Sequence, residues 1–298
     1  MKTLLFAPEN FNIAETTRMI EIARACGDDF HCEFFGYGGE YEHLIREAGF
    51  VCHTLSPRPT PQRVEELWKA DRMERGGKFF THEEMTERVR NELALYAETR
   101  PTAVVIGFTL STFISARAAK IPLVSVNPLA LTGPFFQANP TVWGEMLHGT
   151  PLGWLPGGLV NRAINAWGRR TKLWTKPMNR VAKEFGVRPF TSLTDIFRGD
   201  HTLVTDIPQL TGVPDLPPTW RYVGPIYAKL EGDVPPEIAN LPHDQPIIYF
   251  AMGSSANREV LVRVMQMFAA QPYRVIAPVK RHLAGLDVRS EERRVGKE

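Results

Sequence analysis

Short apolar runs alternate with amphipathic stretches along most of the chain, and this alternation predicts an α/β fold. Apolar, β-rich runs predict seven strands at 3–7, 30–35, 50–55, 102–106, 122–126, 202–205 and 221–223. Apolar residues at helical spacing predict helices at 13–25, 40–48, 62–75, 81–100, 109–119 and 159–185. Strands and helices that alternate at this pitch indicate βαβ units and a parallel sheet.

Several residues indicate where these helices begin and end. Thr81 and Glu84 have the spacing of a capping box, which opens the helix at 81–100. We expect Pro177 to interrupt the helical stretch 159–185 and Gly186 to end it.

Two segments depart from the alternation. Residues 132–156 are rich in proline, glycine and aromatic residues, and we expect an irregular excursion over the carboxyl ends of the strands, where open α/β sheets bind ligands. Its large aromatic residues are Phe135, Phe136, Trp143 and Trp154. Residues 214–246 contain eight prolines, which predict an extended linker without helices.

A second βαβ unit follows the linker. Residues 246–255 form an apolar run that ends in Met-Gly-Ser-Ser, and a helix at 257–270 and a strand at 273–279 follow it. Gly253 lets the backbone approach a ligand, while Ser254 and Ser255 offer hydroxyls and amides at a helix N-terminus, where phosphate binds. Considered alone, the motif favours an ordinary strand-to-helix turn with a serine cap over phosphate binding.

Composition and charge narrow the class of protein. The chain has 298 residues, enough for two domains, with 43% hydrophobic and 23% charged residues, as in globular proteins. A net charge of +2 argues against a dedicated nucleic-acid binder. Three cysteines without a Cys-x-x-Cys motif argue against a disulfide framework or a zinc site and favour a cytoplasmic protein. No apolar run approaches the ~20 residues that cross a bilayer.

Five stretches resemble one family. They are Leu-Ile-Arg-Glu-Ala-Gly-Phe-Val at 44–51, Lys-Ile-Pro-Leu-Val-Ser-Val at 120–126, Pro-Leu-Gly-Trp-Leu-Pro at 151–156, Tyr-Val-Gly-Pro-Ile at 222–226 and Phe-Ala-Met-Gly-Ser-Ser at 250–255. With the order of elements, the chain resembles the nucleotide-sugar glycosyltransferases of the GT-B fold, in the macrolide and UDP-glucuronosyl/glucosyl transferase superfamily. The resemblance implies a Rossmann-like N-terminal domain and an incomplete second Rossmann-like domain.

The resemblance also implies that the two domains bind different substrates. Residues 1–213 are expected to bind the acceptor, 214–245 to form the linker, and 246–288 to begin the nucleotide-sugar domain. Because that domain is short and residues 289–298 are highly charged, we expect this end to be non-native, the gene to continue and the fragment itself to be inactive.

The implied activity moves a hexose from a nucleotide donor, a UDP-sugar by resemblance, to a hydroxyl of an apolar small molecule or lipid, with no metal or other cofactor. Such chemistry needs a base for the acceptor hydroxyl and donors that stabilise the departing diphosphate. Gly253, Ser254 and Ser255 are the candidates for the diphosphate. The four aromatic residues of 132–156 are the candidates for the acceptor pocket, although packing of that segment explains them as well.

The catalytic residues of the resemblance are missing. Asn12 stands where the family has a histidine base, and an amide cannot act as a base. Gly107-Phe108-Thr109 replaces the aspartate that orients this histidine. Glu9 and Glu15 are nearby carboxylates that can substitute if burial raises their pKa. Their place beside a helix start favours ordinary surface glutamates instead, and His148 is a third candidate.

Other functions stay open. The absent histidine and aspartate favour a non-catalytic protein that binds lipids or glycosides, and a nucleotide-sugar epimerase of the same architecture is a third reading. A dehydrogenase is disfavoured because no Gly-x-Gly-x-x-Gly motif follows the first strand. Peripheral contact with a membrane also stays open.

Overall fold

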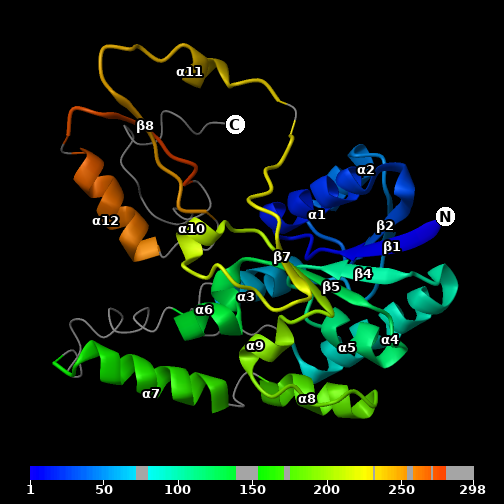
Figure 1. The fold of residues 1–298 in the computed structure, drawn as a ribbon. Coiled ribbons are helices and arrows are strands. Elements are labelled where there is room, and N and C mark those ends of the chain that lie inside the picture. Colours follow the sequence, from blue (N-terminus) through cyan, green and yellow to red (C-terminus); the bar gives the residue numbers. More distant parts are fainter. Residues whose placement is uncertain are drawn as a thin grey trace. The chain divides into compact units, whose positions relative to one another are not determined.

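The computed structural model describes residues 1–71, 80–138, 154–170, 175–230, 232–253, 258–269 and 271–279 (Figure 1). They divide into two compact units. The first contains Met1–Thr60 and Phe80–Lys229, and the second contains helix α3 (Pro61–Asp71) and the chain from Leu230 onward.

The first unit is built on a seven-stranded parallel sheet with the strand order β3-β2-β1-β4-β5-β6-β7. From β1 the chain moves outward through β2 and β3, and then returns to β4 on the other side of β1. The connections therefore reverse direction between β1 and β4, and ligands of open α/β folds bind beyond the carboxyl ends of strands at such a point. The strands are β1 (Lys2–Ala7), β2 (Phe30–Gly36), β3 (Val51–Thr54), β4 (Ala103–Ile106), β5 (Leu123–Asn127), β6 (His201–Val204) and β7 (Trp220–Tyr222).

Helices cover both faces of this sheet, as Figure 1 shows for α1 and α2 on one side and α4 and α5 on the other. The helices and 3₁₀ turns of the unit are α1 (Ile13–Cys26), η1 (Gly27–Asp29), α2 (Glu42–Glu47), α4 (His82–Thr99), α5 (Thr112–Ala119), η2 (Leu129–Leu131), α6 (Gly133–Ala138), α7 (Gly157–Arg170), α8 (Thr175–Glu184), α9 (Leu193–Ile196) and α10 (Pro208–Thr211).

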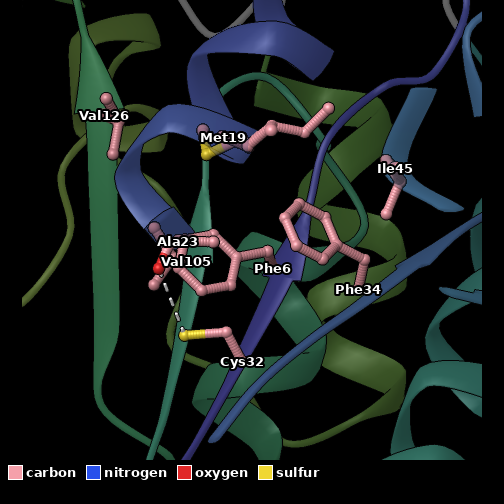
Figure 2. Close-up of a cluster of buried hydrophobic side chains, with 9 residues drawn as sticks. Phe6, Met19, Ala23, Cys32, Phe34, Ile45, Val105 and Val126 are labelled. Carbon is pink, nitrogen blue, oxygen red and sulfur yellow. Dashed lines mark hydrogen bonds between the residues drawn. The ribbon is translucent and has the colours of Figure 1, made fainter. Parts of the chain in front are cut away.

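Alternate residues of each strand pack against opposite helical layers. Phe6 and Phe34 stack with ring centroids 5.0 Å apart, and they pack with Met19 and Ala23 of α1 and Ile45 of α2 (Figure 2). The next residue of β2, Phe35, points the other way and meets Tyr96 of α4 edge-on. Burial on both faces explains why these strands read as continuous apolar runs.

The predicted capping box of α4 is confirmed. The Thr81 hydroxyl accepts a hydrogen bond from the Glu84 N–H at 3.2 Å, and the Glu84 carboxylate accepts one from the Thr81 N–H at 2.8 Å. Thr81→Ala removes the hydroxyl that accepts the Glu84 N–H, so we expect it to lower the free energy of unfolding by about 1 kcal/mol. Urea unfolding measures this, with the exposed mid-helix variant Glu87→Ala as a control; equal stabilities of the two variants contradict the prediction.

All seven predicted strands of the first unit are confirmed, and three details differ. Residues 133–138 of the expected irregular excursion form the short helix α6. Pro177 lies in the first turn of α8, where a missing N–H is tolerated, so it does not break that helix. The proline-rich segment contains the four-residue helix α11 (Pro236–Ala239), because a proline fits the first helical position. No helix in the described ranges is long and apolar enough to cross a membrane.

The second unit contains the predicted strand, helix and second strand in this order. Strands β8 (Ile247–Tyr249) and β9 (Arg274–Ile276) pair in parallel, and helix α12 (Arg258–Ala269) lies between them in the sequence. Within the unit, Phe250 contacts Phe268 of α12 edge-on. Ile247 and Tyr249 are 38% and 70% exposed, so large apolar side chains of this two-stranded sheet face solvent.

Candidate active site

The connection between β1 and α1 brings three candidate residues together at the reversal point of the sheet. Glu9, Asn12 and Glu15 all lie on this connection or on the first turn of α1, beside the carboxyl end of β4. The Asn12 N–H donates to the Glu9 carbonyl at 2.9 Å, which closes a tight turn before the helix.

Asn12 serves the start of α1. Its side-chain oxygen accepts hydrogen bonds from the Ala14 N–H at 3.0 Å and the Glu15 N–H at 3.4 Å. Asparagine is among the best residues for this position, because its short amide satisfies backbone donors that the helix leaves free. The residue that aligns with the family's histidine therefore orients the helix that carries Glu15.

The Glu15 carboxylate lies against the loop that follows β4. Its Oε1 atom accepts a hydrogen bond from the Phe108 N–H at 2.8 Å. Gly107 makes this approach possible, because a Cβ atom there would lie 2.7 Å from Glu15 Oε1. A carboxylate therefore does lie at the end of β4, where the resemblance led us to expect an aspartate, but α1 supplies it.

Burial sets the protonation of Glu15. The side chain is almost fully buried, and loss of water raises its pKa from 4.5 to about 7. The Phe108 N–H partly offsets this effect, and the negative charge of Glu9 raises the pKa further. A carboxylate that exchanges its proton near neutral pH suits general base catalysis.

Glu9 has a different environment. Its carboxylate forms an ion pair with Arg88 of α4 at 2.7 Å, and both side chains are at most 4% exposed. The guanidinium carbon lies 3.7 Å from the centroid of the Tyr37 ring and 4.3 Å from that of Phe80. Because a cation already holds Glu9, Glu15 is the better base of the two.

A buried polar network continues from Arg88 along α4. Glu92 is fully buried and accepts hydrogen bonds from the hydroxyls of Tyr37, Ser111 and Ser115. Burial raises the pKa of Glu92, and these hydroxyls work against the shift. The network ties the end of β2 to α4 and to the start of α5.

The candidate acceptor residues are only partly described. Phe135 of α6 packs into a cluster with Leu129, Val204, Val213 and Trp220, so it also has a structural role. Trp154 precedes α7 and is 78% exposed. Phe136 belongs to α6, but its side chain lies outside the described residues, as do Trp143 and His148. An acceptor pocket made by these residues stays a prediction.

The candidate diphosphate turn lies in the second unit. Gly253 follows β8 with φ of 72°, a conformation that favours glycine. Ser254 and Ser255 lie outside the described residues, so their contact with a diphosphate stays a prediction. In the described part of the chain, no three side chains of the metal-binding types converge on one point.

Gly107→Ala tests the space beside Glu15. The added Cβ atom would lie 2.7 Å from Oε1 and 2.9 Å from Cδ, so the carboxylate has to move and its bond to the Phe108 N–H weakens. We expect a loss of about 1–3 kcal/mol in the free energy of unfolding by denaturant titration. Gly158→Ala is the control, because its Cβ meets nothing within 4 Å. If Gly107→Ala and Gly158→Ala have equal free energies of unfolding, the Glu15 carboxylate does not lie this close to Gly107.

Sequence reasoning missed Arg88, Glu92 and the role of Gly107. The helical period places Met85, Arg88, Val89 and Glu92 on the buried face of α4. Charged residues at core positions of an amphipathic helix were thus the available signal for the polar network. Gly107 directly after a buried strand was a weaker signal, since a glycine there also fits an ordinary turn.

Comparisons with known proteins find similarity to glycosyltransferases. The PGL/p-HBAD biosynthesis rhamnosyltransferase of Mycobacterium bovis (strain BCG) is 28% identical over 281 residues, which cover 93% of this chain and 60% of that protein. An inactive PGL/p-HBAD biosynthesis glycosyltransferase of the same strain is 25% identical over 269 residues, with 88% of this chain and 69% of that protein covered. No protein-family model matches the chain.

A solved structure shares the fold. Glycosyltransferase VinC in complex with DTDP matches with a TM-score of 0.54 at 14% identity, over 97% of this chain and 70% of that one. The resemblance to GT-B glycosyltransferases is therefore confirmed, and so is the α/β fold class. The chain spans about 60% of the length of the rhamnosyltransferase that it matches.

Proposed function

We propose that the chain carries the acceptor half of a glycosyltransferase that moves a hexose from a nucleoside diphosphate sugar to a hydroxyl group. The relation to glycosyltransferases over 93% of the chain supports sugar transfer. The observation that carries the mechanism is the Glu15 carboxylate, which is held beside Gly107 at the reversal point of the sheet. A metal or other cofactor is not part of this proposal.

Glu15 acts as the general base in this mechanism. The acceptor oxygen attacks the anomeric carbon, its proton passes to the Glu15 carboxylate, and the bond from the anomeric carbon to the diphosphate oxygen breaks. The electron pair of that bond leaves with the diphosphate. A pKa of about 7 lets the carboxylate take the proton at neutral pH and release it afterwards.

The donor is a nucleoside diphosphate sugar. The turn after β8, with Gly253, supplies backbone donors to the departing diphosphate in this proposal. The sequence resemblance favours UDP-sugars, whereas the structural neighbour VinC was solved with DTDP. The relative named as a rhamnosyltransferase adds rhamnose to the sugars to be tested.

The acceptor is an apolar small molecule or a lipid. The aromatic residues of the segment that follows β5 support this part of the proposal, and among them Trp154 exposes most of its ring to solvent. An exposed indole offers a flat apolar surface against which a lipid or an apolar ring can pack.

Non-catalytic binding is the second candidate. One matched relative is described as inactive, and Asn12 occupies the place of the usual histidine base. In this alternative, the fold binds a glycoside or lipid without transferring a sugar to it.

A transfer assay separates the two candidates. The 298-residue chain and the complete open reading frame that contains it are incubated with UDP- and dTDP-sugars, rhamnose donors included, and a panel of phenolic and lipid alcohols. Formation of a glycoside, detected by mass spectrometry, supports the enzyme. Saturable acceptor binding without any product in either preparation supports the second candidate and contradicts transfer.

A further inference from the structure

The peptide group that holds the Glu15 carboxylate is itself held from its other side. The Phe108 N–H, which donates to Glu15 Oε1 at 2.8 Å, belongs to the same peptide group as the Gly107 carbonyl. This peptide is trans, so its C=O and N–H point in opposite directions and the carbonyl faces away from Glu15. There it meets the side chain of Asn127, which lies at the carboxyl end of β5 and is 3% exposed.

The neighbours of the Asn127 amide determine which way it faces. One side of the amide lies 3.1 Å from the carbonyl oxygens of Gly107 and Val126, and the other side lies 2.5 Å from the Ser125 hydroxyl oxygen. A carbonyl oxygen can only accept a hydrogen bond, so the amide nitrogen faces the two carbonyls and donates a hydrogen to each. The amide oxygen then faces the Ser125 hydroxyl.

Hydrogen bonds therefore run without a break from Asn127 through the Gly107–Phe108 peptide to Glu15. Hydrogen bonds in series polarise one another, so donation to the carbonyl strengthens the N–H as a donor to the carboxylate. The Asn127 amide also resists rotation of this peptide. Just beyond it, the Thr109 hydroxyl donates to the Ala7 carbonyl at 2.6 Å and ties the same loop to β1.

We propose that Asn127 is a positioning residue for the base Glu15. Its amide fixes the Gly107–Phe108 peptide, and this peptide holds the carboxylate in place while it takes the proton of the acceptor hydroxyl. Without the amide, the peptide can turn and its N–H supports the charged carboxylate less well. The inference rests on the proposed function for its use in sugar transfer, whereas the series of hydrogen bonds can be tested without transfer.

Loss of the Asn127 donor is expected to raise the pKa of Glu15 above its value of about 7. The peptide N–H works against the effect of burial, because a hydrogen bond to the charged carboxylate lowers its pKa. The charged groups that act most strongly on Glu15 are Glu9, whose carboxylate pairs with Arg88, and Arg18 of α1. Substitution of Asn127 leaves these three groups in the protein, so the shift reports on the peptide.

Infrared titration of the 298-residue chain tests this without a catalytic readout. A protonated carboxyl group has a carbonyl band that disappears when the group ionises, and the part of the band that is absent after Glu15→Gln in the same background belongs to Glu15. Asn127→Leu fills a similar volume without a donor, and we expect the midpoint of the Glu15 band to rise by about 0.5–1 pH unit. An unchanged midpoint in folded Asn127→Leu protein overturns the proposal.

A control and a second variant complete the titration. Asn179→Leu removes an amide of α8 that bonds the N–H and the carbonyl of Phe190 at 2.7 and 2.9 Å, and we expect no shift of the Glu15 midpoint. An equal shift in this control contradicts a specific role of Asn127. If Asn127→Leu does not fold, Asn127→Ser takes its place and should give the same rise, because its hydroxyl ends one bond short of the amide nitrogen.

Transfer by the complete open reading frame shows whether this positioning serves catalysis. We expect Asn127→Leu to lower kcat about tenfold, to leave KM for the acceptor within about twofold, and to shift the pH profile upward by as much as the infrared midpoint. Asn179→Leu should keep the wild-type kcat and profile. A lower kcat with an unshifted profile assigns Asn127 to the fold alone and overturns the proposal. If no preparation transfers a sugar, the proposed function fails, and the infrared midpoint still decides whether Asn127 holds Glu15.

Discussion

Glu15→Gln is expected to abolish most sugar transfer while it makes the protein more stable at neutral pH. Glutamine keeps the shape of the side chain, and its oxygen still accepts the Phe108 N–H, but it cannot take a proton. Loss of a general base typically lowers a rate about 10²–10⁴-fold. Acceptor binding is expected to stay the same, because glutamine fills the same space beside Gly107.

The gain in stability follows from the raised pKa of Glu15. Burial raises this pKa from 4.5 to about 7, so the folded state holds the proton more tightly than the unfolded state. The free energy of unfolding therefore falls as the pH rises from about 4.5 to about 7, by about 3 kcal/mol in total. The glutamine of the variant stays neutral and escapes this loss. The free energy of unfolding of the variant should exceed that of the wild type by about 3 kcal/mol at pH 8 and by less than about 1 kcal/mol at pH 5.

Denaturant unfolding at the two pH values measures this difference. Glu98→Gln, at the exposed end of α4, is the control, and we expect no pH-dependent gain in its free energy of unfolding. The rate of transfer by the wild type should rise with pH to a plateau above about pH 7. A Glu15→Gln enzyme with wild-type activity contradicts the base, whereas equal stability at pH 8 contradicts the burial of its charge.

The fold was predictable because its signals are local. The apolar runs at β1, β2 and β4 have the length and composition of buried parallel strands, and their burial on both faces explains the match. Thr81 and Glu84 likewise set the start of α4 by contacts between near neighbours. The prolines misled the prediction at Pro177 and Pro236, since proline interrupts a helix only beyond its first turn.

The candidate site was predictable only in part. The sequence indicated Glu9 and Glu15, because they follow the first strand, but it could not rank them. Their ranking depends on residues far along the chain: Arg88 pairs with Glu9, while Gly107 and Phe108 receive Glu15. The partners of Glu9 and Glu15 lie 79 and 93 positions away along the chain, and such distant contacts leave no periodic signal in one sequence. They nevertheless decide which carboxylate is paired with a cation.

Arg88→Met is expected to be the most destabilising single change at this site. Methionine fills much of the space of the arginine stem, but it leaves the buried Glu9 carboxylate without its cation. It also removes the cation that lies over the rings of Tyr37 and Phe80. Removal of one partner of a buried ion pair costs about 3–5 kcal/mol, and we expect a loss of this size in the free energy of unfolding at pH 7.

Glu9→Gln/Arg88→Met tests whether the unpaired charge causes the loss. The double variant should recover a large part of the stability that Arg88→Met loses, because no buried charge stays without a partner. Arg24→Met removes the ion pair between Glu21 and Arg24, whose side chain is 42% exposed, and should cost less than about 1 kcal/mol. The unpaired Glu9 charge should also raise the pKa of Glu15 further. In the Arg88→Met background, Glu15→Gln should therefore increase the free energy of unfolding by more than it does in the wild type. If the stability losses of the two single changes simply add in the double variant, the unpaired charge is not the cause. Packing of the arginine stem then accounts for the effect of Arg88→Met.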